Sequence, residues 1–341
     1  MERTVVDLHV DKSTVDTNTE KKYHRGRIHV HARSLMPEKQ LFSYAEYHAQ
    51  AAEQIGYSEY SYWKSVWRNF LKKKMAVVML VLFALIFVFT FVAGSISKYD
   101  VNHLRIDNSL MFTRPNAEFW FGTDNLGRCL FSRILTGARS SLSATLVIVL
   151  VTAVIGTTAG VTAGYYGGPL DAVIQKLLLI VQSFPGQVMA IAVAGVLGAG
   201  VKNAAIALIS IGWISYARMS RSMVLKIKES NYIKAARLCG CNSVYIILHH
   251  VIPNIGSVLF VTAMLALPGT MMEISSLSFL GLSAKLPTPE WGYMMNEGRK
   301  VLMTAPWQAL IPGGAILISV IILNRLGDSV QEYLEFRAGS L

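Results

Sequence analysis

Long apolar runs separated by polar segments dominate the chain after about residue 74. Uncharged runs occupy 75–96, 142–164, 177–201, 204–217, 255–272 and 307–323. A helix that crosses a bilayer needs about 20 mostly apolar residues. The pattern therefore predicts an all-α, polytopic membrane protein with about six transmembrane helices. The third and fourth runs are separated by glycines and polar residues between 198 and 203, which predict a tight reversal.

Polar side chains inside or beside these runs are candidates for the lining of a transport path. Gln182 and Gln187 flank Pro185, and Glu273 follows the fifth run. Polar groups are costly within lipid, and a proline frees backbone carbonyls, so a kinked helix with nearby amides fits a lined path. The amides fit interhelical hydrogen bonding equally well, and Glu273 also fits a marker of the membrane interface. The four-residue spacing of Gly156, Gly160 and Gly164 predicts close helix packing.

The region before the first run differs in character. Residues 1–61 show little apolar periodicity and mixed charge, which predicts a flexible cytoplasmic tail. In 62–74, Trp63, Trp67 and Phe70 recur at helical spacing beside lysines, which predicts an interfacial amphipathic helix. His24, His29 and His31 in the tail are compatible with a metal or with acidic lipid headgroups. A solvated, uncommitted tail is favoured, because no ordered scaffold fixes a ligand geometry.

Composition excludes several classes of protein. The chain is 341 residues long, 52% hydrophobic and only 16% charged, with a net charge of +11. Three cysteines exclude a secreted disulfide scaffold. No G-x-x-x-x-G-K-[ST] motif is present, so the chain is not expected to be an ATP-hydrolysing enzyme of that type. Basic residues before the first run and between Arg218 and Arg237 place both termini in the cytoplasm by the positive-inside rule.

The sequence pattern of the predicted cytoplasmic loop 218–254 predicts ordered secondary structure. Ser230 or Asn231 can cap a helix that ends at Gly240 in the left-handed conformation, and Asn242 or Ser243 can cap a second helix. Ala235 and Ala236 give the first helix a low-profile face, with charged residues at its flanks. This is the shape of a docking element, although a loop that packs only on its own bundle fits the pattern as well.

The motifs of this loop and of two further segments resemble those of a known family. The loop is similar to the E-A-A-x-x-x-G, nine residues, I-x-L-P motif of bacterial ABC-importer membrane subunits. Residues 121–139 (FGTDNLGRCLFSRILTGAR), 279–295 (FLGLSAKLPTPEWGYMM) and 324–328 (NRLGD) resemble segments of the peptide/nickel group. Together the motifs resemble those of the C-type permease subunit of dipeptide, oligopeptide or nickel importers. Departures from the family pattern are Lys234, His250, Cys129 and Ser283.

The resemblance implies a type I ABC-importer permease fold over 75–341, with an outer segment 97–140 and a coupling loop 218–254. The residues that it assigns to ATPase coupling are Lys234, Ala235, Ala236, Gly240, Ile252 and Pro253. The matched residues of the outer segment are Gly122, Thr123, Asp124, Gly127, Arg128, Arg133, Gly137 and Arg139. From the residues themselves, Asp124, Arg128 and Arg133 are expected to form a charged network, and tight glycine turns favour a compact cap over direct substrate contact.

The resemblance also implies function and partners. The chain is expected to be half of a heterodimeric pore in the bacterial inner membrane, with a second permease subunit and two ATPase subunits that bind Mg-ATP. An extracytoplasmic solute-binding protein would select the cargo. Peptides are the preferred cargo and a nickel or other metal chelate is the alternative. Membrane lipid is the remaining expected partner; a cofactor, a metal and nucleic acid are not expected for this chain.

Two rival classes remain open. His249 and His250 would be the ligands of an intramembrane metalloprotease, but adjacent residues on a helix point in different directions, whereas zinc pairs use i, i+4 spacing. Cys239 and Cys241 form a C-x-C pair, for which packing near a helix end is favoured over redox chemistry. A membrane receptor or scaffold that recruits a non-ATPase partner through 218–254 is the second rival.

Overall fold

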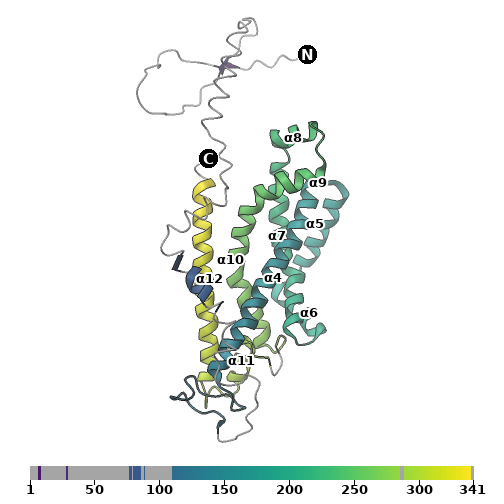
Figure 1. Ribbon diagram of the computed structural model, residues 1–341. Coiled ribbons are helices and arrows are strands. Elements are labelled where there is room, and N and C mark those ends of the chain that lie inside the picture. Colours follow the sequence, from purple (N-terminus) through teal and green to yellow (C-terminus); the bar gives the residue numbers. More distant parts are fainter. Residues whose placement is uncertain are drawn as a thin grey trace, which may run out of the picture. The chain divides into compact units, whose positions relative to one another are not determined.

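The structure, a computed structural model, describes residues 7–8, 28–29, 77–78, 80–85, 88, 110–284 and 288–338 (Figure 1). The chain divides into two compact units, Met1–Ser65 and Val66–Leu341. In the first unit, β1 (Asp7–Leu8) pairs antiparallel with β2 (Ile28–His29). These strands are the described part of the predicted tail, and the predicted interfacial helix 62–74 lies outside the described residues.

The second unit is helical. Residues 77–78, 80–85 and 88, in the first predicted span, are in helix. The remaining described helices are α4 (Leu130–Tyr166), α5 (Gly168–Gln182), α6 (Gly186–Leu197), α7 (Val201–Ile227), α8 (Asn231–Leu238), α9 (Ser243–Ile246), the π-helix η2 (Ile247–Val251), α10 (Ile252–Phe279), α11 (Trp291–Arg299) and α12 (Trp307–Ala338). Figure 1 shows α8 at one end of this bundle and α11 at the other, and these ends are called the α8 end and the α11 end.

Three described helices are long and apolar enough to cross a membrane: α4, the continuous helix Ser243–Phe279, and α12 over Trp307–Glu332. The pair α5 and α6 is a fourth candidate, bent by 88° at its break. These numbers cover only the described residues, which leave out most of the first predicted span. The predicted all-α, polytopic class is confirmed.

The closest helix contact joins α4 to α7 through the predicted glycine stripe. Gly156 lies against the backbone of Trp213, Gly160 against Ala217, and Gly164 against Val224. Because the contacts advance together along both sequences, α4 and α7 run in the same direction. The absent side chains let the two backbones approach closely, which favours association where lipid provides no hydrophobic driving force between helices. α7 therefore runs beside α4 along this stretch, although α7 is not among the described helices that are long and apolar enough to cross a membrane.

The chain between these parallel helices has to return across the bundle, and it does so in two pieces. Gly167 and Gly168, both with positive φ, form the reversal from α4 into α5. The predicted kink at Pro185 is present: α5 ends at Gln182, and α6 begins after Pro185, which cannot donate to an α-helical ladder. The third predicted run, 177–201, therefore covers the end of α5 and all of α6. The predicted reversal before α7 is confirmed by Gly198 at φ 80°, and Asn203 Nδ2 donates to the carbonyls of Leu197 and Gly198 at 2.8 and 2.9 Å.

α10 and α12 complete the unit. They run antiparallel, with Leu267 and Met271 of α10 in one apolar cluster with Ile316 and Leu323 of α12. The same cluster includes residues of α4 and α11, so it forms the core toward the α11 end. A second cluster, which contains Val161, Val224, Ile233 and Val251, forms the core toward the α8 end.

The glycine contact predicts opposite effects for the same substitution at two sites. A Cβ on Gly160 would lie 2.8 Å from Ser220 Cβ and closer still to the Ala217 carbonyl oxygen. We expect Gly160→Ala to lower the free energy of unfolding by about 1–3 kcal/mol, as overpacking does. A Cβ on Gly195 would have no neighbouring atom within 4 Å. Gly195→Ala should therefore raise the free energy of unfolding by up to about 1 kcal/mol, because alanine has the higher helix propensity. Thermal unfolding in detergent, followed by circular dichroism, compares them; equal melting temperatures would contradict the close contact.

Candidate functional site

Helix α8 presents one buried and one exposed face. Ile233 is fully buried among Val161, Tyr165 and Val224, and Ala236 is half-buried beside it. The opposite face carries Ala235 and Leu238, and Leu238 is 89% exposed. An apolar side chain with this exposure at the tip of a helix, beside a small alanine, provides a surface that a partner can cover. The predicted low-profile face is therefore present at Ala235, whereas Ala236 lies partly against the bundle.

The end of α8 has the geometry that the sequence predicts. Gly240 has φ 78°, its N–H donates to the Arg237 carbonyl at 3.0 Å, and the Cys241 N–H donates to the Ala236 carbonyl at 3.1 Å. This pair of bonds is a Schellman motif, which needs a left-handed residue at Gly240. The Asn242 side chain then caps α9 at Val244 N. The helix, turn, helix arrangement of the loop is thus confirmed.

The start of α8 differs from the prediction. Ser230 occupies the N-cap position, but its hydroxyl donates to the Ile227 carbonyl at 2.6 Å and makes no capping bond to α8. The hydroxyl therefore joins α8 to the end of α7, because Ile227 is the last residue of that helix.

Polar contacts fix the base of α8 to the bundle. Lys228 Nζ donates to the Gly164 carbonyl at 3.0 Å, which satisfies one of the free carbonyls at the C-terminus of α4. The Arg237 guanidinium lies over the Tyr165 ring, 5.0 Å from its centroid. Together with the buried Ile233, these contacts attach α8 to both helices of the glycine pair. A force on α8 is therefore transmitted to α4 and α7.

The remaining residues that the resemblance assigns to coupling have different surroundings. Lys234 pairs with Glu229 at 3.6 Å on the exposed surface, where such pairs contribute little to stability. Ile252 and Pro253 begin α10, directly after the π-helix η2. Asn254, the next residue, donates through Nδ2 to the Tyr232 hydroxyl at 2.7 Å, and so links the start of α10 to α8.

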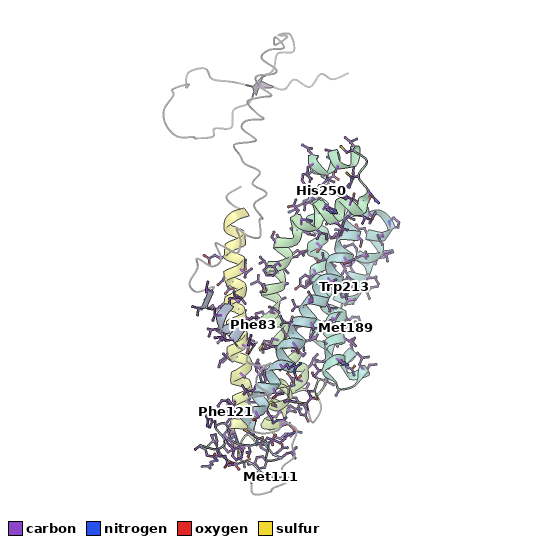
Figure 2. All side chains as sticks on the ribbon, in the orientation of Figure 1. Phe83, Met111, Phe121, Met189, Trp213 and His250 are labelled. Carbon is purple, nitrogen blue, oxygen red and sulfur yellow. The ribbon has the colours of Figure 1, made fainter. Side chains whose placement is uncertain are left out.

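His249 and His250 take part in ring packing. Figure 2 places His250 near the α8 end. Tyr245 stacks on His249 with ring centroids 4.2 Å apart, and His250 meets the Tyr245 ring edge-on. Within the described ranges, no group of three or more histidine, cysteine, aspartate or glutamate side chains is arranged to hold a metal. Cys129, Cys239 and Cys241 are free cysteines.

At the α11 end, three buried charged side chains, Asp124, Arg128 and Arg133, form the predicted network together with a half-buried, unpredicted member, Glu297. Arg128 Nε and Arg133 Nε lie 2.7 and 3.4 Å from Asp124 Oδ2. Glu297 Oε2, on α11, lies 3.8 Å from Arg128 and 3.7 Å from Arg133. Asp124 Oδ1 also accepts the N–H groups of Leu126 and Arg128 at 2.9 Å. Burial raises the pKa of Glu297, and the two arginines oppose that rise.

Glu297 is the residue that sequence reasoning missed. The available signal was the composition of 121–139, which contains three arginines and one acidic residue. Two arginines buried beside a single carboxylate need a second acid, because an unpaired buried charge is costly. The sequence did not show which acid, since Glu297 comes from α11, far along the chain.

Other matched residues of the outer segment shape its backbone and packing. Gly122 and Gly127 have positive φ and form the expected turns. Thr123 bridges to Cys129, and its carbonyl accepts from Gln308 Nε2 at 3.3 Å. Gly137 lies against Trp291, where a Cβ would be 3.1 Å from the ring. Arg139 is exposed on α4. The predicted tight turns are present at Gly122 and Gly127, whereas the turn expected at Gly137 is wrong, because Gly137 lies inside α4 and serves close packing instead.

Glu290 joins this cap to α4 and begins α11. Its Oε1 accepts from the Ser141 hydroxyl and from the Gly292 N–H, both at 3.1 Å, and its Oε2 accepts from the Tyr293 N–H at 2.8 Å. Burial raises the pKa of this carboxyl, and the hydrogen bonds oppose that rise. Trp291 Nε1 donates to the Ile134 carbonyl at 2.9 Å. The segment that begins α11 is therefore fixed to α4 by hydrogen bonds, which indicates a structural role.

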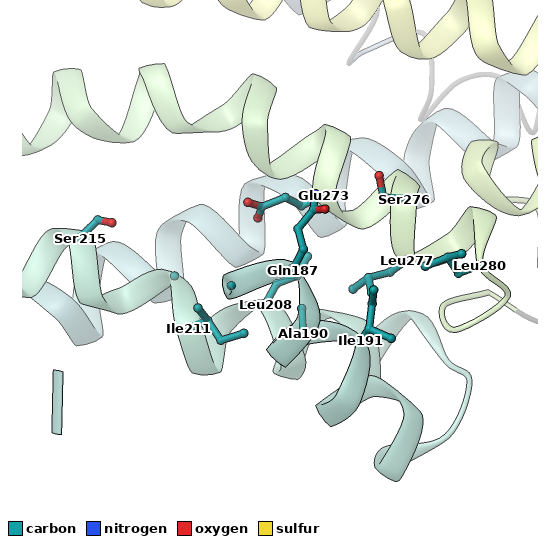
Figure 3. A pocket seen from close by; sticks show the side chains of 12 residues that line it. Gln187, Ala190, Ile191, Leu208, Ile211, Ser215, Glu273, Ser276, Leu277 and Leu280 are labelled. Carbon is teal, nitrogen blue, oxygen red and sulfur yellow. The ribbon is translucent and has the colours of Figure 1, made fainter. Parts of the chain in front are cut away.

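Two of the three candidate pore residues come together. Gln187 of α6 and Glu273 of α10 both line a pocket of about 220 Å³ between α6, α7 and α10 (Figure 3). Gln182 is exposed at the end of α5 and does not line this pocket. The bend at Pro185 separates the two glutamines, because it turns α6 away from the axis of α5.

Comparisons with known proteins agree with these motifs. The family described as "Binding-protein-dependent transport system inner membrane component" matches residues 156–340, and the "N-terminal TM domain of oligopeptide transport permease C" matches residues 61–115. The glutathione transport system permease protein GsiD of Escherichia coli O157:H7 is 38% identical over 274 residues, which are 80% of this chain and 90% of that protein. The dipeptide transport system permease protein DppC of Alkalihalophilus pseudofirmus is 36% identical over 282 residues, 82% and 91% of the two chains.

One solved structure has a similar fold. A chain of the inward-facing methionine ABC transporter MetNI superimposes with a TM-score of 0.50 at 17% identity. The match covers 60% of this chain and 97% of that one.

The charge network makes a prediction about stability. Asp124→Asn removes the carboxylate nearest to both arginines and leaves only the more distant Glu297. We expect it to lower the free energy of unfolding by about 3–5 kcal/mol, as breaking a buried ion pair does. The matched control is Asp328→Asn, because Asp328 is exposed. Thermal unfolding of both purified variants measures the difference, and a melting temperature shared by the two variants would show that the network does not stabilise the cap.

Proposed function

Because the chain belongs to the family of binding-protein-dependent transport system inner membrane components, we propose that it forms half of the translocation pore of an ATP-driven importer. It is a transport subunit and not an enzyme. The observation that carries the proposal is the exposed face of α8, which is held firmly on α4 and α7 but leaves Ala235 and Leu238 uncovered. This face docks on a separate ATPase subunit.

Docking at α8 explains how the work of ATP hydrolysis reaches the pore. When two ATPase subunits close on Mg-ATP, each moves the helix docked in it. The contacts of Ile233, Arg237 and Lys228 with the bundle pass this motion to α4 and α7, and the packed helices switch between inward-facing and outward-facing arrangements. The chain itself binds no cofactor, and Mg-ATP belongs to its partners.

The charge distribution supports an orientation with the α8 end and both termini in the cytoplasm. Lys226, Lys228, Lys234 and Arg237 lie around α8, near the membrane boundary where the positive-inside rule applies. At the α11 end, by contrast, Arg128 and Arg133 are buried and balanced by Asp124 and Glu297. In this proposed orientation the protein lies in the inner membrane with its cap on the outer side.

The complete importer contains further subunits. A second permease subunit forms the other half of the pore as a heterodimer with this chain, and two ATPase subunits dock below. An extracytoplasmic solute-binding protein delivers the cargo to the capped side, as the description of the family implies. Membrane lipid covers the apolar outer surfaces, on which residues such as Leu150 and Val154 of α4 are exposed.

Dipeptides or oligopeptides are the proposed cargo. The relatives of this chain transport glutathione in one case and dipeptides in the other, by their names, and glutathione is itself a small peptide. A nickel or other metal chelate is the alternative. Reconstitution with the neighbouring subunits and the binding protein tests the cargo: labelled dipeptide should enter proteoliposomes with ATP, whereas labelled nickel should not. Nickel uptake without peptide uptake would assign the chain to metal import.

A receptor or scaffold role makes a different prediction about the same surface. A receptor would retain its partner through α8 without any ATPase. Copurification of the α8 loop with an ATPase subunit, and loss of that subunit from a variant of α8, supports transport over the scaffold.

The α8 surface makes a direct prediction about coupling. Ala235→Arg places a long charged side chain on the exposed face, so we expect ATP-dependent uptake to fall at least about tenfold, which corresponds to about 1.4 kcal/mol of lost docking. The subunit should remain inserted and folded because Ala235 makes no buried contact. Ala235→Ser, which keeps the side chain small, should transport at nearly the normal rate. Normal uptake by Ala235→Arg would exclude docking at this face.

A further inference from the structure

The pocket between α6, α7 and α10 combines a carboxylate with an apolar wall. Its polar members are Gln187 from α6, Ser215 from α7, and Glu273 and Ser276 from α10. The rest of the lining is apolar or glycine, with Ile191, Leu208, Ile211, Leu277 and Leu280 as the large side chains. Figure 3 shows Gln187 reaching from α6 toward α10, where Glu273 lies.

Glu273 has no cationic partner in the part of the chain that the structure describes. It lies six residues before the end of α10, so it is about 9 Å from that end at 1.5 Å per residue. An ionisable group at such a position is costly in a membrane protein and is retained where it serves a transport path or pairs with another group. The pocket therefore presents a carboxylate that is unpaired among the described residues and is available to bind a cation.

The polar groups suit one kind of cation in particular. A primary ammonium has three N–H donors and no acceptor. Glu273 supplies a carboxylate, and the amide oxygen of Gln187, which lies beside Glu273 in Figure 3, supplies a further acceptor. The large aliphatic side chains suit an apolar group next to that ammonium. The amino-terminal residue of a peptide has this combination, a charged α-ammonium beside a side chain.

The size of the pocket limits what enters it. The pocket has a volume of about 220 Å³. This is less than the roughly 300–1,000 Å³ of a complete small-molecule site. Gln187 and Glu273 are exposed on the surface of the isolated chain, so the pocket is open on one side. One terminal residue fits, and the remainder of a peptide has to lie beyond it, where the second permease subunit would complete the site.

We propose that this pocket is a half-site for the amino-terminal residue of a peptide in transit, with Glu273 binding its α-ammonium group. The inference rests on the proposed function and names the part of the cargo that this chain recognises. Gln187, which lies beside Glu273 in Figure 3, orients the ammonium, and the aliphatic wall accepts the first side chain. The break at Pro185 is what places Gln187 at this pocket, since a straight continuation of α5 would not run as α6 does.

Uptake by the complete transporter tests the assignment. Proteoliposomes with both permease subunits and both ATPases receive saturating binding protein loaded with tritiated alanyl-leucine, so that delivery of cargo is the same for each variant. Glu273→Gln should reduce the initial rate of uptake at least about tenfold, while the ATPase activity stimulated by loaded binding protein stays within about twofold of normal. Glu273→Asp, which keeps the carboxylate, should restore most of the uptake.

Asp328→Asn is the control, because Asp328 is an exposed carboxylate of α12 outside the pocket and undergoes the same change from acid to amide. It should transport at the normal rate. Uptake by Glu273→Gln at the normal rate overturns the inference. So does a parallel loss of uptake and ATPase activity in both Glu273 variants, which would mark a structural role. Loss of the second permease subunit from Glu273→Gln on gel filtration would assign Glu273 to an ion pair between subunits.

Failure of the proposed cargo gives a different result. In that case the normal transporter itself takes up no alanyl-leucine, although it hydrolyses ATP and imports a nickel chelate. If the normal transporter imports alanyl-leucine and Glu273→Gln does so equally well, only the assignment of this pocket fails.

Discussion

The close contact between α4 and α7 determines the arrangement of the other helices. Glycines at 156, 160 and 164 let the backbones touch, and the register of these contacts makes the two helices parallel. Two parallel helices of one chain need a return segment between them, just as parallel strands need a crossover connection. Here the return is α5 with α6, and its length and its break at Pro185 follow from the need to return across the bundle beside a pair that is already packed.

The same contact explains why α8 is a firm attachment point. α7 ends beside the C-terminus of α4, so the turn into α8 meets both helices at once. Lys228 reaches a free carbonyl of α4, Ile233 fills the space between α4 and α7, and Arg237 covers Tyr165. A partner that moves α8 therefore moves the two helices that are most tightly joined, and the motion is not lost in a flexible loop.

The two ends of the bundle use different chemistry for different tasks. At the α11 end, buried charges and the Glu290 hydrogen bonds hold a compact cap, in which each carboxylate has several partners. Between the ends, Glu273 lies in a pocket without such partners among the described residues. A carboxylate surrounded by hydrogen bonds and arginines is suited to rigidity, whereas one that faces an open pocket is available to a ligand. The structure thereby separates structural acids from a candidate binding acid.

The sequence by itself determined the class of fold, the glycine stripe, the turn at Gly240 and the charges at Asp124, Arg128 and Arg133, because each depends on local spacing or on the conformation that one residue permits. The tertiary structure alone decided that Glu297 completes the charge network, that Ala236 faces inward while Ala235 faces outward, and that Gln187 meets Glu273 but Gln182 does not. These pairings join residues distant in sequence: Glu297 comes from α11, and Glu273, which lines the pocket with Gln187, comes from α10. Apolar periodicity predicts that a segment is buried in lipid or protein, but it carries no information about which neighbour each face meets.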